Sequence, residues 1–119
     1  MCGIIALYNL QQSPSEARAR ALSMAGRIRH RGPDWSGVFA NNNCVLAHER
    51  LAIVDVESGA QPLYDASNSN VLCVNGEIYN HKVLAATLKQ EHSWKTKSDC
   101  EVLLYLYKEK GIDFLNELN

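Results

Sequence analysis

The residue best suited to covalent chemistry is Cys2, because it sits at the extreme N-terminus. If the initiator Met1 is removed, its thiol and a free α-amine share one residue. An amine with a reference pKa of about 8 can then act as the local general base, so no distant histidine is required. Taken alone, a cysteine at position 2 is also consistent with a small residue at a frayed chain end.

Two charged residues have the chemistry to hold the ends of a free amino acid. Arg50 runs straight into an apolar segment, and a guanidinium at a strand edge suits a bidentate grip on a carboxylate. Asp99 lies where the sequence predicts a helix start, and a carboxylate held there can pair with a substrate ammonium. The alternatives are a surface ion pair of Arg50 with Glu49 or a neighbour, and a purely electrostatic role of Asp99 at the helix dipole.

The dipeptide Asn75-Gly76 follows an apolar run typical of a buried strand. The Asn75 side-chain amide and the Gly76 N–H could converge on one point, as an oxyanion hole requires, and glycine lets a substrate approach the backbone closely. The same dipeptide is also typical of a type I′ hairpin turn. Only a short segment separates it from Asn80, so a second hairpin strand would be stunted.

The other histidines and cysteines indicate neither a metal centre nor a disulfide framework. The four histidines lack H-x-x-x-H and H-x-x-E spacing, so we expect no metal site. The four cysteines contain no C-x-x-C pair and are expected to be reduced thiols. The loop His30-Arg31-Gly32-Pro33-Asp34 has residue types found in active sites, but it equally fits a helix stop followed by a turn.

Local patterns in the first half of the chain predict a strand, a helix and a hairpin. Apolar β-formers predict a strand over 4–8, which would tie Cys2 into a sheet. Ser13-Pro14-Ser15-Glu16 predicts a capping box and a helix over 14–28. Strands near 36–40 and 44–48 flank three asparagines and predict a hairpin.

The second half predicts further strands and then two helices. The expected strands are the apolar runs 51–56 and 71–74. Asn80 is expected to cap a helix over 81–90, and Ser98-Asp99-Cys100-Glu101 predicts a second capping box before a helix that ends at Gly111. Strands followed by helices, without βαβ alternation, predict an α+β layered fold.

Composition excludes several classes of protein. The chain has 119 residues, 46% hydrophobic and 21% charged, which predicts one globular domain. A formal net charge of −1 argues against nucleic-acid binding. The longest apolar run, 102–107, falls far short of the roughly twenty residues that span a bilayer, and the N-terminus lacks signal-peptide features. We therefore expect a cytoplasmic protein with no membrane partner.

Six short motifs span the chain, and their order is more specific than any one of them. They are Met1-Cys2-Gly3-Ile4, Arg29-His30-Arg31-Gly32-Pro33-Asp34, Ala47-His48-Glu49-Arg50-Leu51-Ala52-Ile53-Val54-Asp55, Gln61-Pro62-Leu63, Asn75-Gly76-Glu77-Ile78-Tyr79-Asn80 and Ser98-Asp99-Cys100-Glu101. Together they resemble the glutaminase domain of glutamine-dependent asparagine synthetases, which are N-terminal-nucleophile amidotransferases. Glucosamine-phosphate synthase and the purine amidotransferase share the leading cysteine but not the second and fifth motifs in this form.

The resemblance implies a reaction and the residues that perform it. Glutamine would be hydrolysed through a glutamyl thioester on Cys2, and the ammonia would pass to a synthetase site where ATP activates aspartate. Asn75 and Gly76 match the oxyanion hole. An amide is cleaved best when its anionic tetrahedral centre meets donors already in place.

The resemblance also implies how glutamine is recognised. Arg50 matches the residue that binds the α-carboxylate, and Asp99 matches the partner of the α-ammonium. Glu77 and the backbone around Ile53 and Val54 match further substrate contacts. Lys97 departs from the glycine that many members carry before Ser-Asp, although Asp99 itself is kept.

The fold implied by the resemblance is an antiparallel two-sheet sandwich flanked by helices, an αββα arrangement of the N-terminal-nucleophile hydrolase type. Residues 1–119 would form the N-terminal part of the amidotransferase domain, with the later strands and the synthetase domain absent. A sandwich lacking those strands would be marginally stable or oligomeric. No cofactor is expected in the glutaminase half, whereas ATP and magnesium would bind the synthetase domain. The expected partners are glutamine and that domain, and a homodimer is left open.

Two other hypotheses remain at this point. The chain could be a non-catalytic module that folds with a partner, or that binds glutamine without turning it over. It could also be the glutaminase domain of a sister amidotransferase with another ammonia acceptor. Retention of Met1 would favour the first alternative, and only the form of the motifs argues against the second.

Overall fold

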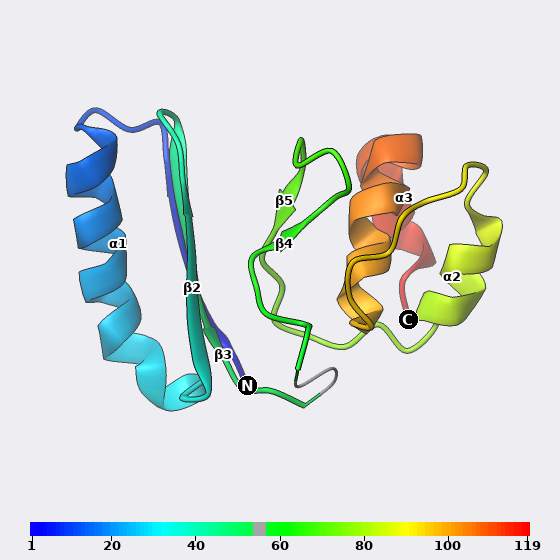
Figure 1. The fold of residues 1–119 in the computed structure, drawn as a ribbon, viewed down its shortest axis with the longest axis horizontal. Helices are drawn as coiled ribbons and strands as arrows, with labels where there is room; N and C mark the ends of the chain where they lie inside the picture. Colours follow the sequence, from blue (N-terminus) through cyan, green and yellow to red (C-terminus); the bar gives the residue numbers. More distant parts are fainter. Residues whose placement is uncertain (54–56) are drawn as a thin grey trace.

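The computed structural model of the protein describes residues 1–53 and 57–119. Figure 1 shows helix α1, a first sheet, a second smaller sheet and then helices α2 and α3, stacked in that order along the long axis. The helices are α1 (Pro14–Ile28), α2 (His81–Thr87) and α3 (Val102–Lys110), with 3-10 turns η1 (Arg29–Arg31), η2 (Asp99–Glu101) and η3 (Gly111–Glu117). The strands are β1 (Gly3–Tyr8), β2 (Trp35–Ala40), β3 (Cys44–Arg50), β4 (Leu63–Tyr64) and β5 (Val71–Leu72).

The first sheet has the order β1-β3-β2, with antiparallel pairing on both sides of the central strand. Gly3 pairs with Glu49, and Gly37 of β2 pairs with His48. Side chains alternate between the two faces of a sheet, so this register sends His48 and Arg50 to one face and Glu49 to the other. The predicted first strand and hairpin are confirmed, and Asn41 Oδ1 closes the turn by accepting from the N–H of Cys44 at 2.8 Å.

Helix α1 covers the face of this sheet that carries Glu49. Its buried alanines, Ala17, Ala21 and Ala25, pack against Val45 and Ala47 of β3. The helix begins as predicted: Ser13 Oγ accepts from the Glu16 N–H at 3.4 Å, and the Glu16 carboxylate accepts from the Ser13 N–H at 3.0 Å. The prediction of a helix over 14–28 and its capping box is confirmed.

The second sheet is a short antiparallel pair in which Leu63 pairs with Leu72. The strand predicted over 71–74 is confirmed only for its first two residues. A strand over 51–56 is wrong for residues 51–53, which have no regular secondary structure, and residues 54–56 lie outside the described part. The second core cluster packs against α3 and consists of Leu63, Ile78, Leu84, Cys100, Val102, Leu103, Leu104, Leu106 and Phe114.

Helix α2 ends earlier than the predicted residue 90. The N–H groups of Lys89 and Gln90 donate to the Glu109 carboxylate at 3.0 and 3.1 Å, so a side chain from α3 takes the donors that would have extended the helix. Asn80 precedes α2 but makes no side-chain capping bond. Its amide instead donates to the Glu117 carbonyl at 2.7 Å, which attaches the C-terminal segment to this helix.

The second predicted capping box is wrong. Ser98 Oγ does accept from the Cys100 N–H at 3.3 Å, but Glu101 does not reach back to Ser98. The Glu101 carboxylate is buried and accepts from the N–H groups of Lys95 and Thr96, both at 2.7 Å. Residues 99–101 therefore form a 3-10 turn, and α3 starts at Val102 and ends, as predicted, at Gly111.

The α+β class with antiparallel strands is confirmed. The assignment to the N-terminal-nucleophile hydrolase type stays a prediction. Among the described residues, no helix has the length and apolar character needed to cross a bilayer.

The glycine at position 37 makes the contact between the two halves testable. A Cβ at Gly37 would overlap the Gln61 carbonyl, which lies directly over the sheet. We expect Gly37→Ala to destabilise the protein by about 1–3 kcal/mol, as overpacking does. Gly26→Ala is the matched control, because Gly26 is exposed in α1 with no described atom close to the place of its Cβ, and it should stabilise by up to ~1 kcal/mol. Thermal melting of both variants decides; equal melting of Gly37→Ala and wild type would contradict the contact.

Candidate active site

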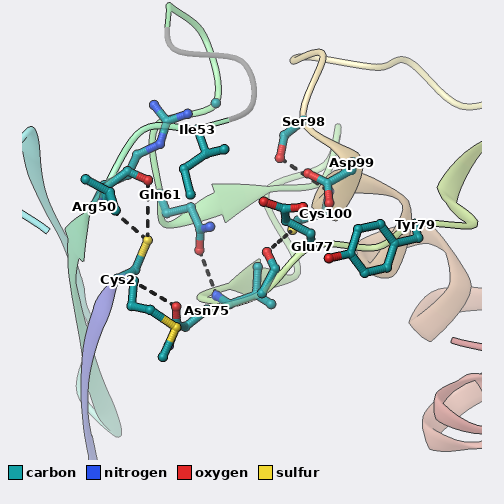
Figure 2. A pocket seen from close by; sticks show the side chains of 15 residues that line it. Cys2, Arg50, Ile53, Gln61, Asn75, Glu77, Tyr79, Ser98, Asp99 and Cys100 are labelled. Atoms are coloured by element: carbon teal, nitrogen blue, oxygen red, sulfur yellow. Dashed lines mark hydrogen bonds between the residues drawn. The ribbon is translucent and has the colours of Figure 1, made fainter. Parts of the chain in front are cut away.

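A pocket of about 260 Å³ opens between the end of the first sheet and the second half of the chain. It collects all the predicted site residues that the structure describes, namely Cys2, Arg50, Ile53, Asn75, Gly76, Glu77 and Asp99. Val54 lies outside the described residues. Figure 2 shows Cys2 and Arg50 on the side of the sheet, with Asp99 and Tyr79 across the pocket.

Cys2 reaches the pocket because β1 pairs with β3. Gly3 lies opposite Glu49, so the preceding residue falls beside Arg50 at the end of β3. The N–H of Leu51 donates to Cys2 Sγ at 3.4 Å, and Arg31 Nε donates to the Cys2 carbonyl at 3.0 Å. These contacts hold a half-buried thiol at the pocket wall, so Cys2 is not a residue at a frayed end.

Asn75 contacts the nitrogen of the candidate nucleophile. The Cys2 N–H donates to Asn75 Oδ1 at 3.0 Å (Figure 2). In a chain that begins at Cys2, this same nitrogen is the α-amine. The hairpin interpretation of Asn75-Gly76 is wrong, because a type I′ turn needs positive φ at both positions, neither has it, and residues 73–80 form no strand.

Arg50 ends β3 and lies at the pocket wall with only 6% of its surface exposed. Its carbonyl accepts from the Asp34 N–H at 3.0 Å, which fixes the backbone at the strand end. Glu49 points to the other face, where it accepts from Ser36 Oγ at 2.6 Å. A surface ion pair between Arg50 and Glu49 is therefore wrong.

Asp99 lies on the 3-10 turn before α3 and is 6% exposed. Its Oδ2 accepts from the Ile78 N–H at 2.6 Å, and the neighbouring Cys100 Sγ donates to the Gly76 carbonyl at 3.6 Å. Burial raises the pKa of the Cys100 thiol to about 12, so this sulfur stays protonated near neutral pH. Asp99 and Cys100 together attach the Gly76–Ile78 segment to α3.

Several residues of the pocket were not assigned a role from the sequence. They are Met1, Leu51, Gly59, Gln61, Val74, Tyr79, Ser98 and Cys100. The signal for Gln61 was present in the Gln61-Pro62-Leu63 motif. Its function is visible only in three dimensions, where Gln61 Oε1 accepts from the Val74 N–H at 2.7 Å. Within the described residues, no group of three or more His, Cys, Asp or Glu side chains is placed to hold a metal ion.

The model of the glutamine amidotransferase domain family matches residues 1–119. The chain belongs to this family. It is 52% identical over 118 residues to the asparagine synthetase B (glutamine-hydrolyzing) of Escherichia coli (strain K12), covering 99% of this chain and 21% of that protein. It is 50% identical to the probable asparagine synthetase (glutamine-hydrolyzing) of Dictyostelium discoideum and to asparagine synthetase (glutamine-hydrolyzing) 2 of Oryza sativa subsp. japonica, covering 100% of this chain and 22% and 20% of those proteins.

The family resemblance inferred from the six motifs is thus confirmed. The chain spans about a fifth of the length of the curated relatives it matches.

His48 lies behind the pocket, on the same face of β3 as Arg50, and is 0% exposed. Its Nε2 is 3.1 Å from the Val74 carbonyl, which can only accept, so Nε2 carries the proton of a neutral ring. Nδ1 has no hydrogen-bond partner among the described residues. Burial, with a smaller contribution from the Arg50 charge, lowers the pKa of His48 below its ordinary value of 6.5.

The lowered pKa of His48 predicts a loss of stability in mild acid. Between the unfolded pKa of about 6.5 and the lower folded value, the unfolded chain binds more protons, so the free energy of unfolding decreases as pH falls through this range. His48→Gln removes the ionisable group and should flatten this decline. Denaturant unfolding of both proteins at about pH 7.5 and about pH 5.5 measures it.

The carboxylates with lowered pKa do not confuse this comparison. Asp65 and Glu16 lose their stabilising contribution only as pH falls below about 4.5. If His48→Gln kept the full pH dependence of the wild type between the two pH values, the neutral buried state of His48 would be wrong.

Proposed function

We propose that this chain hydrolyses the side-chain amide of glutamine through a thioester on Cys2. The ammonia would be used for ATP-dependent synthesis of asparagine from aspartate by the longer protein. The observation that carries the proposal is the convergence of Cys2, Asn75, Arg50 and Asp99 on one pocket, in a member of the glutamine amidotransferase domain family. The three relatives described above are named as glutamine-hydrolysing asparagine synthetases, which supports the choice of acceptor.

The proposed first step uses the chain terminus as its own base. With Met1 removed, the Cys2 α-amine takes the thiol proton, and the sulfur attacks the amide carbon of glutamine. A carbon–sulfur bond forms, and the carbonyl π electrons move to oxygen. That oxyanion would be stabilised by the Asn75 side-chain N–H and the Gly76 backbone N–H.

Asn75 can serve both partners because its amide has two ends. Oδ1 accepts from the Cys2 nitrogen at 3.0 Å, which leaves Nδ2 as a donor for the oxyanion. Gly76 lacks a positive φ, and no described atom lies within 4 Å of the place that a Cβ would take, so the protein itself does not require glycine there. The close approach of a substrate would require it.

The intermediate then collapses in two stages. The carbonyl re-forms, the carbon–nitrogen bond breaks, and the nitrogen takes the proton from the Cys2 ammonium to leave as ammonia. The amine next removes a proton from water, whose oxygen attacks the thioester carbon. Glutamate leaves, and the sulfur recovers its proton, which restores the starting thiol.

Recognition of glutamine would use the two buried charges on either side of the pocket. Arg50 is proposed to bind the α-carboxylate, and Asp99 the α-ammonium. Asp99 uses one oxygen for the Ile78 N–H and, being a carboxylate, retains further acceptor sites. Ile53 and Glu77 line the same pocket and are proposed as further contacts, as is Val54.

The wider arrangement follows the same proposal. The helix, sheet, sheet, helix order in Figure 1 supports an N-terminal-nucleophile hydrolase fold. A synthetase domain that binds ATP and magnesium would be the partner of this domain, in a cytoplasmic enzyme. No cofactor is proposed for the glutaminase reaction itself.

The first prediction from this proposal concerns the nucleophile. We expect mature protein to begin at Cys2, and Cys2→Ala to abolish thioester formation while glutamine binding is largely kept, because the thiol performs the chemistry and not the recognition. Intact mass after exposure to 6-diazo-5-oxo-norleucine detects the covalent adduct. Cys44→Ala is the matched control, since Cys44 lies at the far end of β3 and should leave labelling intact. Robust glutaminase turnover by Cys2→Ala would overturn the proposal.

The second prediction concerns Arg50. Removing a bidentate partner from a carboxylate in a closed pocket costs about 2–5 kcal/mol, so Arg50→Ala should weaken glutamine binding by roughly 30-fold or more. Arg50→Lys should recover it only in part, because an ammonium lacks the planar fork. Synthesis from free ammonia by the intact protein should be unchanged. Unaltered glutamine affinity in Arg50→Ala would show the assignment to be wrong.

A further inference from the structure

Val74, the residue before Asn75, is held from two sides by side chains. Its N–H donates to Gln61 Oε1 at 2.7 Å, and its carbonyl is 3.1 Å from His48 Nε2. Figure 2 shows the Gln61 side chain directed at the main chain next to Asn75. The Val74 carbonyl belongs to the peptide plane that ends in the Asn75 nitrogen, so fixing this carbonyl fixes the start of the Asn75-Gly76 segment.

The segment needs such support because it has no regular structure of its own. Strand β5 ends at Leu72 and α2 begins at His81, and residues 73–78 lie outside both sheets. On its far side, the segment is bonded to Asp99 and Cys100. The position of Asn75 and Gly76 therefore depends on side chains and not on a strand ladder.

His48 is costly to keep in this place for packing alone. It is wholly buried, and within the described part of the chain its Nδ1 is a buried polar atom without a partner, which destabilises a protein relative to an apolar side chain of the same shape. Opposite it, Gly37 leaves room for the Gln61 backbone to lie on the sheet, where a Cβ would overlap the Gln61 carbonyl. The pair Gly37 and His48 thus seats both groups that hold Val74.

We propose that His48 and Gln61 are positioning residues of the oxyanion hole: by fixing both polar groups of Val74, they set where Asn75 and Gly76 present their donors. The inference rests on the proposed glutaminase function. His48 acts through Val74, because it lies behind the pocket wall and does not line the pocket. Gln61 lines the pocket, but its Oε1 is engaged by the Val74 N–H.

The primary test uses two variants of His48 in the intact protein. His48→Phe keeps a flat ring but no donor for the Val74 carbonyl, whereas His48→Gln can supply an N–H at the position of Nε2. Because loss of one oxyanion donor lowers kcat by about 10²–10³-fold, we expect misplacement in His48→Phe to lower it by about 10–100-fold. The KM for glutamine should change by less than about threefold, and His48→Gln should restore kcat to within about threefold.

Phe39→Leu is the matched packing control. Phe39 lies on the same face of the sheet and packs edge-on against Tyr64, with ring centroids 6.2 Å apart and away from Val74. The smaller side chain should lower the melting temperature without lowering kcat. A parallel loss of kcat in Phe39→Leu would mean that weaker packing explains His48→Phe, and it would overturn the proposal.

A second readout separates the oxyanion hole from substrate recognition. The γ-aldehyde analogue of glutamine adds the Cys2 thiol across its carbonyl: a carbon–sulfur bond forms, the π bond breaks and the oxygen takes the proton. This adduct needs the oxyanion hole, whereas glutamate needs only the two charged partners. We expect His48→Phe to weaken inhibition by the aldehyde about tenfold or more, with glutamate inhibition unchanged. Equal losses for both inhibitors would overturn the proposal.

Gln61 keeps the inference testable if His48→Phe does not fold. Gln61→Leu removes the acceptor of the Val74 N–H, and Gln61→Glu keeps one, so the first should reproduce the kcat and aldehyde effects and the second should largely recover them. Unchanged kcat in Gln61→Leu would overturn the inference. Failure of the proposed function is distinguishable, because wild-type protein would then show neither turnover nor labelling of Cys2.

Discussion

The antiparallel pairing of β1 with β3 is the constraint on which the rest of the site depends. It brings the chain terminus to the end of the central strand, where the Leu51 N–H meets Cys2 Sγ across 49 positions of sequence. Because side chains alternate along a strand, a slip of one residue would turn Arg50 away from the pocket and towards α1. The alanine face of α1 prevents such a slip, since it accepts Val45 and Ala47 and leaves no room for a guanidinium.

The opposite wall of the pocket is built by different means. Residues 73–78 belong to no sheet and are held by side chains from both halves of the molecule, His48 and Gln61 before Asn75, and Asp99 and Cys100 after it. Cys100 and the buried leucines of α3 share one core cluster. The geometry of the candidate oxyanion hole is therefore tied to the packing of that core, since a shift of α3 would move two of its four supports.

The cysteines illustrate how environment separates residues of one type. Burial raises the pKa values of the Cys73 and Cys100 thiols to about 12, so neither forms a thiolate near neutral pH. Cys100 instead uses its S–H as a donor to the Gly76 carbonyl. Cys2 differs by its position, since it alone of the four can share its residue with an α-amine, and its sulfur lies where the substrate pocket opens.

The sequence by itself determined the features that depend on neighbours in the chain. The capping box at Ser13, the hairpin through Asn41 and the stop at Gly111 all arise from local hydrogen bonds or backbone preference. The residue types of the site were also readable, because the chemistry of a terminal thiol or a guanidinium does not depend on the fold. Only the tertiary structure decided where α2 ends, that Glu101 turns to Lys95 and Thr96, and that His48 holds Val74. These are contacts with groups brought near by folding, and a buried donor or acceptor takes whichever partner folding supplies.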